Sequence, residues 1–216
     1  MIDTIPPETV RLIHSTKHYI VERARTARRF IKQTMPPYSI DELQIIEIPR
    51  EGQSHLQQLA QWCKEGLHVG VMSESGMPAV ADPGNRIVAY AHSNKIKVKV
   101  ASGPSSIIMA LAASGLNGQN FAFNGYLPIK EHELRKCLKS LENKILKEKQ
   151  CQIFIEVPYR NDRMFQFLIK ELRPDIKLCI ARDITGEFEF ISTAAVSEWK
   201  KQNFKIQKHP TIFILG

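Results

Sequence analysis

The sequence predicts an α/β protein, because short runs rich in β-branched residues alternate with helical patterns along almost the whole chain. The 216 residues, 43% of them hydrophobic, are enough to bury the core of one large domain or of two small ones. Such alternation is typical of strand–helix–strand units around a mainly parallel sheet. We place a domain boundary near Gly118, which predicts two α/β domains, residues 1–118 and 119–216.

The first block alternates strands and helices from its start. Pro6 and Pro7 suit the start of a helix, and Pro36 and Pro37 end an arginine-rich helix that runs through Lys32. The strands expected in this block are residues 18–22, 43–48, 68–73 and 96–101. The further helices expected are residues 54–64, 85–93 and 105–114.

The second block has the same alternation and ends on a strand. The strands expected here are residues 120–124, 152–156, 177–182, 187–193 and 211–215. The helices expected are a long basic one at residues 130–149, then residues 160–172 and a short one at 195–201. Neither block contains an internal repeat or a low-complexity tract.

Several protein classes find no support in the sequence. No run approaches the roughly 20 apolar residues of a membrane-spanning helix, and the polar start lacks the apolar core of a signal peptide. We therefore expect a cytoplasmic protein with no membrane partner. The four cysteines form no CxxC pair and have no histidine at zinc-ligand spacing, so no metal site is expected. The signatures GxSxG, GxxxxGK[ST] and GxGxxG are missing, which argues against hydrolases, ATPases and dehydrogenases.

The formal net charge of +8 makes a polyanionic partner such as RNA plausible. Basic residues crowd two segments, residues 23–32 and residues 130–149. Both segments fit an RNA-binding track, but the sequence alone favours the solvated face of a helix as the explanation of each.

Residues 73–84, SESGMPAVADPG, form the most distinctive loop of the chain. Its glycines and prolines follow an apolar strand pattern, and such a loop lets backbone N–H and C=O groups approach a ligand closely. Ligands of open α/β sheets bind beyond the carboxyl ends of the strands, where this loop is expected to lie. An ordinary strand-to-helix connection explains the same pattern.

A second loop, residues 102–106 with the sequence SGPSS, follows the next expected strand and opens a helix. Pro104 suits the first helical position, which leaves the N–H groups and hydroxyls of Ser105 and Ser106 free at the positive end of that helix. Such a terminus binds carboxylate or phosphate, and helix capping alone also explains it. Because the two loops end consecutive strands, we expect them to face one crevice.

Polar side chains end two strands of the second block, Glu156 after residues 153–155 and Arg182 after residues 178–180. An ion pair between Glu156 and Arg182 that braces the sheet explains this placement, and so does a substrate-facing role. Residues 124–126 are further candidates for a pocket lining.

Taken in order, these motifs resemble the tetrapyrrole-methylase superfamily, and most closely its branch that methylates a ribose 2′-hydroxyl in small-subunit (16S) ribosomal RNA. The resemblance spans nearly the whole chain. The segments that carry it are residues 20–22 with the arginine-rich helix, residues 73–84, 100–106, 123–128, 154–160 and 181–185.

The resemblance implies a two-domain methyltransferase, usually a homodimer, that holds S-adenosylmethionine between its domains and acts on ribosomal RNA or the small ribosomal subunit. The cofactor-binding residues it implies are Glu74, Ser75, Gly76, Ser105, Ser106, Pro210 and Thr211. Glu156 is the candidate for a catalytic base or orienting group. The candidates for holding RNA phosphates are Arg23, Arg28 and Arg182. Methyl transfer depends on in-line positioning of the acceptor oxygen, so no metal is required.

The chain departs from the family pattern in two places. The family begins with a strand and a glycine loop central to the first sheet, whereas this chain starts at Met1, after that element. A truncated sequence explains this, and a sheet without the strand is expected to have unpaired backbone groups. The second departure is Glu74, Ser75 and Met77, where the ribosomal branch more usually has aspartate, alanine and threonine.

Two alternatives to the ribosomal assignment stay open on the sequence. One is a methyltransferase that acts on a tetrapyrrole or corrinoid precursor. The other is a non-catalytic RNA-binding relative that keeps the fold, which the missing strand and the basic segments motivate.

Overall fold

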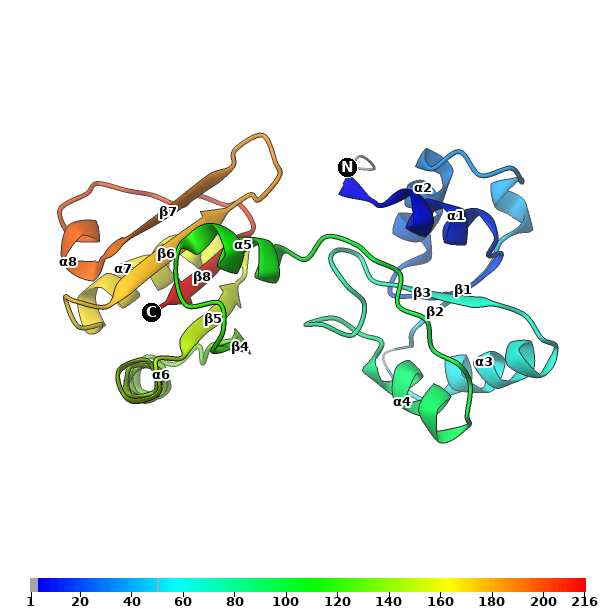
Figure 1. Cartoon of the computed structure of the whole chain (residues 1–216), viewed down its shortest axis with the longest axis horizontal. Coiled ribbons are helices and arrows are strands. Elements are labelled where there is room, and N and C mark those ends of the chain that lie inside the picture. Colours follow the sequence, from blue (N-terminus) through cyan, green and yellow to red (C-terminus); the bar gives the residue numbers. More distant parts are fainter. Residues whose placement is uncertain (1–3, 50) are drawn as a thin grey trace. The chain divides into compact units, whose positions relative to one another are not determined.

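The computed structural model describes residues 4–49 and 51–216, and its chain divides into two compact units, Met1–Ser105 and Ser106–Gly216 (Figure 1). The division precedes the boundary that the sequence suggested near Gly118. The chain was expected to start after the family's first strand. Residues 1–3, with which it starts, lie outside the described residues. Each unit is described on its own below.

The first unit is built on a three-stranded parallel sheet with the strand order β2-β1-β3. Its strands are β1 (His18–Val21), β2 (Gln44–Glu47) and β3 (Val69–Met72). Its helices are α1 (Pro7–His14), α2 (Ala24–Gln33), the short 3-10 helix η2 (Ile40–Glu42), α3 (Ser54–Lys64) and α4 (Asn85–Ser93). The central strand β1 pairs with β2 through Ile20 and Ile46, and with β3 through Ile20 and Val71.

Helices cover both faces of this sheet, because β1 is apolar on both faces, as in parallel sheets generally. Tyr19 and Val21 pack in one cluster with Ala27 and Ile31 of α2. Ile20, which points to the opposite face, packs in a second cluster with residues of α3 and α4 that include Trp62. The core of the unit is therefore two small clusters on either side of one buried strand.

Residues 96–101, which the sequence predicted as a strand, form no strand in the structure, so this prediction is wrong. Val98 is 38% exposed and Val100 is 71% exposed. A strand needs a neighbour that accepts its backbone hydrogen bonds, and the described part of this unit pairs nothing with the outer edge of β3. The apolar alternation is present in the sequence, but it has no sheet to join.

The second unit contains a five-stranded mixed sheet with the order β4-β5-β8-β6-β7. The strands are β4 (Phe121–Tyr126), β5 (Cys151–Glu156), β6 (Lys177–Arg182), β7 (Phe190–Ala195) and β8 (Thr211–Leu215). Only β4 and β5 are parallel, because β8 runs opposite to both of its neighbours and β6 and β7 are antiparallel. The expectation of a mainly parallel sheet therefore holds for the first unit and is wrong for the second.

The two faces of this sheet carry separate cores. The helices of this unit are α5 (Ser106–Ser114), α6 (Glu131–Glu148), the 3-10 helix η3 (Pro158–Arg160), α7 (Asn161–Glu171) and α8 (Val196–Trp199). The larger core gathers residues of α6, α7 and α8 with Phe154 and Phe213, and the smaller one packs Ala110 and Leu111 of α5 against Ile214. Because α5 packs on this sheet, it belongs to the second unit, and this explains why the division precedes Gly118.

The other helices and strands occur where the sequence predicts them, with ends that differ by a few residues, and the α/β fold class is confirmed. The two 3-10 helices had not been anticipated. Among residues 4–49 and 51–216, no helix combines the length and the apolar character needed to cross a membrane.

Candidate functional site

The loop of residues 73–84 leaves the carboxyl end of β3 and folds back on itself before α4 begins. The backbone N–H of Ala79 donates to the carbonyl of Pro83 at 3.3 Å. Gly84 has φ 136°, and a Cβ there would lie 3.2 Å from the backbone nitrogen of Ala79, so this position needs glycine. Gly76, with φ 68°, is exposed and has open space around it.

Glu74, a predicted cofactor-binding residue, is held by residues at the end of β1 and the start of α2. Its backbone N–H donates to Glu22 Oε2 at 2.9 Å, and its Oε1 accepts from Thr26 Oγ1 at 2.9 Å. Arg23 Nε lies 3.1 Å from Glu74 Oε2. The structure therefore pairs a predicted phosphate-binding arginine with a predicted cofactor-binding carboxylate, and both side chains are well exposed.

A third carboxylate, Asp82, lies close to Glu22 and Glu74. Burial raises the pKa of Asp82, and the negative charges of Glu22 and Glu74 raise it further, while a hydrogen bond from Ser73 lowers it. Asp82 is not among the site residues that the sequence predicts. Its position inside the glycine-proline loop was the only available signal, because the spacing along the chain does not show that it lies near the end of β1.

Arg28, the second predicted phosphate contact, lies on an exposed basic face of α2. This face consists of Arg25, Arg28, Arg29 and Lys32, which are all exposed and recur at the i, i+3, i+4, i+7 spacing of one helix face. None of the four forms an ion pair among the described residues, whereas Ala27 and Ile31 are buried in the core. The positive charge of this face is therefore uncompensated.

The second predicted loop, residues 102–106, does not follow a strand, so the expectation of two loops on consecutive strand ends is wrong. Its carbonyl at Ser102 accepts a 2.6 Å hydrogen bond from Thr9 Oγ1 of the α1 helix. Ser105 is the last residue of the first unit, and Ser106 opens α5 in the second.

In the second unit, three predicted site residues lie in one row across the sheet. Thr211 of β8 is in register with Glu156 of β5 on one side and with Arg182 of β6 on the other. One of the two explanations offered for this placement, an ion pair between Glu156 and Arg182, does not occur, and Arg182 binds other groups. Its Nε donates to the carbonyl of Phe188 at 3.2 Å, and its guanidinium lies 5.5 Å from the ring centre of Phe190.

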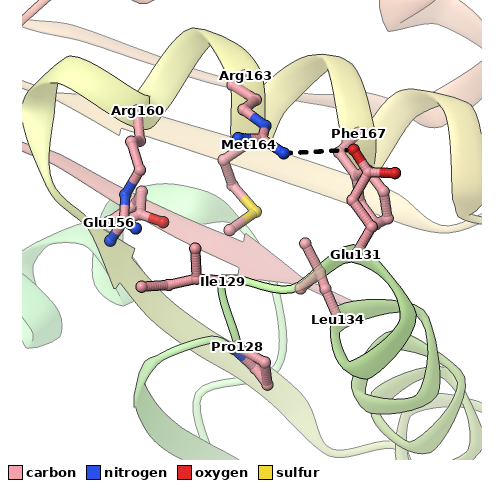
Figure 2. Close-up of a pocket in the computed structure, with 9 residues that line it drawn as sticks. All are labelled: Pro128, Ile129, Glu131, Leu134, Glu156, Arg160, Arg163, Met164 and Phe167. Carbon is pink, nitrogen blue, oxygen red and sulfur yellow. Dashed lines mark hydrogen bonds and ion pairs between the residues drawn. The ribbon is translucent and has the colours of Figure 1, made fainter.

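Glu156 pairs instead with Arg160, which follows it by one turn (Figure 2). Arg160 Nη2 donates to Glu156 Oε1 at 2.8 Å, and the backbone N–H of Val157 donates to the same oxygen at 2.7 Å. The Glu156 side chain is only 4% exposed, and that of Arg160 is 22% exposed. The buried carboxylate thus fixes the arginine at the carboxyl end of β5. Arg160 is not among the site residues that the sequence predicts, and its place in the segment 154–160 is the only signal for it.

Pro210 and Thr211 are anchored by the start of α7 and the end of β6. Asn161 Nδ2 donates to the carbonyl of His209 at 2.7 Å and to Thr211 Oγ1 at 3.2 Å, and the carbonyl of Pro210 accepts from Asp183 N–H at 2.8 Å. Asn161 is fully buried, and its Oδ1 has no hydrogen-bond partner among residues 4–49 and 51–216. In the described part of the chain, no three histidine, cysteine, aspartate or glutamate side chains gather as a metal site would require.

Comparison with known proteins assigns the chain to a family. Residues 3–199 match the model for Tetrapyrrole (Corrin/Porphyrin) Methylases. "Ribosomal RNA small subunit methyltransferase I" from Thermotoga maritima is 33% identical over 151 residues, which cover 69% of this chain and 64% of that protein. The chain spans about half the length of several other curated relatives with the same name.

Two solved structures have the same fold at low sequence identity. "Crystal structure of the methyltransferase CobJ" is similar with a TM-score of 0.64 and 16% identity, over 100% of this chain and 89% of that one. A uroporphyrin-III C-methyltransferase from Thermus thermophilus, solved in complex with S-adenyl homocysteine, has a TM-score of 0.54 and 16% identity over 99% of this chain and 91% of that one. The resemblance seen in the motifs is thereby confirmed, and the chain belongs to the tetrapyrrole (corrin/porphyrin) methylase family.

Proposed function

We propose that this chain carries an S-adenosylmethionine-dependent methyltransferase that methylates a ribose 2′-hydroxyl in small-subunit ribosomal RNA. The observation that supports this most is the family match over residues 3–199 together with a curated relative, 33% identical, that is named for methylating small-subunit ribosomal RNA. The net charge of +8 is consistent with an RNA substrate.

The chain has backbone groups that fit the proposed cofactor. Ser75 and Gly76 are exposed, and their N–H groups donate no hydrogen bond among the described residues. These donors suit a carboxylate or a ribose hydroxyl, which S-adenosylmethionine carries. We propose that Ser75 and Gly76 bind it together with Glu74, Ser105, Ser106, Pro210 and Thr211. The structural neighbour solved with S-adenyl homocysteine supports this cofactor class.

In this proposal the cofactor supplies an activated methyl group on a sulfonium, and the protein supplies positioning. We assign Glu156 an orienting role, because its Oε1 is already occupied by Arg160 and Val157. The cavity that Glu156 lines has a volume of about 30 Å³, which is the room of one water molecule and not of a ribose. Glu156 therefore acts through Arg160.

For the RNA phosphates, we propose the basic face of α2 around Arg28 as the main contact of the first unit. Arg23 is a weaker candidate, because its charge is neutralised by Glu74. Arg182 is also weaker, because its guanidinium donates a hydrogen bond to the carbonyl of Phe188. We further propose a cytoplasmic homodimer, which the family resemblance supports. Sedimentation velocity tests the dimer, and a monomer at micromolar concentration would contradict it.

The first test of the function is calorimetric titration of S-adenosylmethionine into the protein. Binding at one site per chain is expected. The matched variant is Gly76→Pro, which removes a backbone donor and also forces the φ of 68° toward the roughly −65° that proline imposes, so it remodels the loop locally. We expect it to weaken cofactor binding while circular dichroism stays unchanged.

The second test is transfer of a tritiated methyl group from the cofactor to small ribosomal subunits. Label in the ribosomal RNA supports the proposal. Label that appears only with a tetrapyrrole precursor would establish the tetrapyrrole alternative, and RNA binding without any cofactor binding would establish the non-catalytic one. Either of the last two results contradicts the proposed function.

A further inference from the structure

An open groove lies at the edge of the second unit where the parallel strands β4 and β5 end. It has a volume of about 570 Å³ and is lined by Tyr126, Leu127, Pro128, Ile129, Glu133, Val157 and Arg160. The small cavity beside Glu156 adjoins it and shares Pro128, Ile129 and Arg160 with it. In Figure 2, Arg163, Met164 and Phe167 of α7 lie on one side of that cavity, with Pro128 and Ile129 on the other.

Three large side chains with apolar surface are exposed at or beside this groove. Tyr126 is 58% exposed, Ile129 is 63% exposed and Tyr159 is 71% exposed. The hydroxyls of Tyr126 and Tyr159 have no hydrogen-bond partner among the described residues. Tyr19 and Tyr38, by contrast, both donate to the carbonyl of Ile13 in the first unit. Tyr126, which lines the groove, and Tyr159, whose ring neighbours the groove residue Arg160, therefore present free rings and free hydroxyls to a partner.

The positive charge at the groove is held in a fixed position. The guanidinium of Arg160 is bound to the buried Glu156, and its Cζ lies 5.7 Å from the ring centre of Tyr159. Its Nε is buried and has no hydrogen-bond partner in the described part of the chain. Arg163, paired with Glu131 at 3.3 Å, adds a second and more exposed guanidinium beside the cavity.

We propose that this groove binds an unpaired segment of RNA, with bases stacked on Tyr126 and on Tyr159 beside it. Exposed aromatic rings next to fixed arginines are the pattern by which proteins bind single-stranded nucleic acid. Residues 106–216 carry 17 lysines and arginines against 12 aspartates and glutamates, so the unit as a whole favours a polyanion. This inference rests on the proposed function, because it names the form of RNA that the enzyme takes.

The test compares the double variant Tyr126→Ala/Tyr159→Ala with the matched pair Tyr126→Phe/Tyr159→Phe. Affinity is measured by fluorescence anisotropy with a short labelled single-stranded RNA, and again with the same RNA annealed to its complement. We expect the alanine variant to lose about tenfold in single-strand affinity for each ring, and the phenylalanine variant to keep its affinity. Because stacking is not ionic, the salt dependence of binding should stay the same in both variants.

A control variant is Phe188→Ala, which removes an exposed aromatic side chain from another loop of the same unit and should leave RNA binding unchanged. Equal affinity of the alanine and phenylalanine variants would overturn the proposal, as would a preference for the duplex. The assay uses no cofactor and no methyl transfer. Failure of the groove therefore leaves the proposed function standing, and failure of methyl transfer with intact RNA binding removes the function alone.

Discussion

The two units differ in how completely their sheets are covered. In the second unit, every residue of the central strand β8 is buried, and the core on one face contains four fully buried aromatic side chains, Phe154, Phe165, Trp199 and Phe213. In the first unit only β1 is well buried, whereas β3 is half-buried along its whole length and residues 96–101 find no strand to pair with. The sheet of the second unit is therefore the more completely packed of the two.

The two units also differ in the functional groups that they present. The first unit presents exposed backbone donors at Ser75 and Gly76 and an uncompensated basic face on α2. The second unit holds its charged groups in place, with Glu156 and Arg160 packed at the end of a buried strand. Positioning of a substrate requires fixed groups, so we assign the orienting role to the second unit.

The largest expected effect is on the core of the second unit. Phe213 stacks on Phe154 with ring centres 5.4 Å apart, and Phe213→Ala should lower the free energy of unfolding by about 3–5 kcal/mol through the cavity it leaves. The chain has two tryptophans, Trp62 in the first unit and Trp199 in the second, so single-tryptophan variants report each unit separately. In urea, the Trp199 transition should shift while the Trp62 transition does not. If both shifted together, the two units would unfold as one and the comparison would fail.

The next largest effect on stability is expected for the buried ion pair between Glu156 and Arg160. Arg160→Met leaves the Glu156 carboxylate buried without its cation, and we expect a loss of about 1–3 kcal/mol of stability in the second unit. Glu156→Gln should cost less, because the amide oxygen still accepts from Val157. A double-mutant cycle by chemical denaturation measures the coupling. No coupling between the two residues would contradict the orienting role of Glu156.

A smaller effect is expected for the basic face of α2. Arg25→Gln/Arg28→Gln should lower the slope of log affinity for RNA against log salt by about 2, since each arginine contributes one phosphate contact. Stability should hardly change, as both side chains are exposed and unpaired. The matched control is Lys200→Gln/Lys201→Gln, two exposed lysines at the end of α8 that should leave the slope unchanged. An unchanged slope for the α2 variant would remove this face from the proposed RNA contact.

The smallest effect is a pH dependence at Asp82. The pKa of Asp82 is raised in the folded state, so the folded protein binds its proton more tightly than the unfolded chain does. Stability from this group is therefore present in acid, below its ordinary pKa, and is lost as the pH rises through the folded pKa. Asp82→Asn should stabilise the first unit at neutral pH and not in acid, as followed by Trp62 fluorescence. A stabilisation that was equal at both pH values would contradict the assigned cause.

The sequence predicted most helices and strands because their apolar periodicity is a local property of the chain. It failed where the structure of a segment depends on residues far away in the sequence. Residues 96–101 have a strand pattern, but pairing depends on an edge that residues elsewhere must provide. The insertion of β8 between β5 and β6 could not be foreseen, because a strand's direction leaves no mark on its own apolar pattern. The candidate site shows the same limit: Glu156 was correctly seen as a polar strand end, yet its partner was sought at Arg182 and proved to be Arg160.

The central claim is methylation of a ribose hydroxyl in small-subunit ribosomal RNA, and the most direct measurement is the chemical form of the transferred label. Small subunits are incubated with the protein and tritiated S-adenosylmethionine, and the purified RNA is hydrolysed in alkali. A 2′-O-methyl group blocks alkaline cleavage at its own nucleotide, so we expect the label to be recovered in alkali-resistant dinucleotides. Label recovered in mononucleotides would place the methyl group on a base and contradict the account.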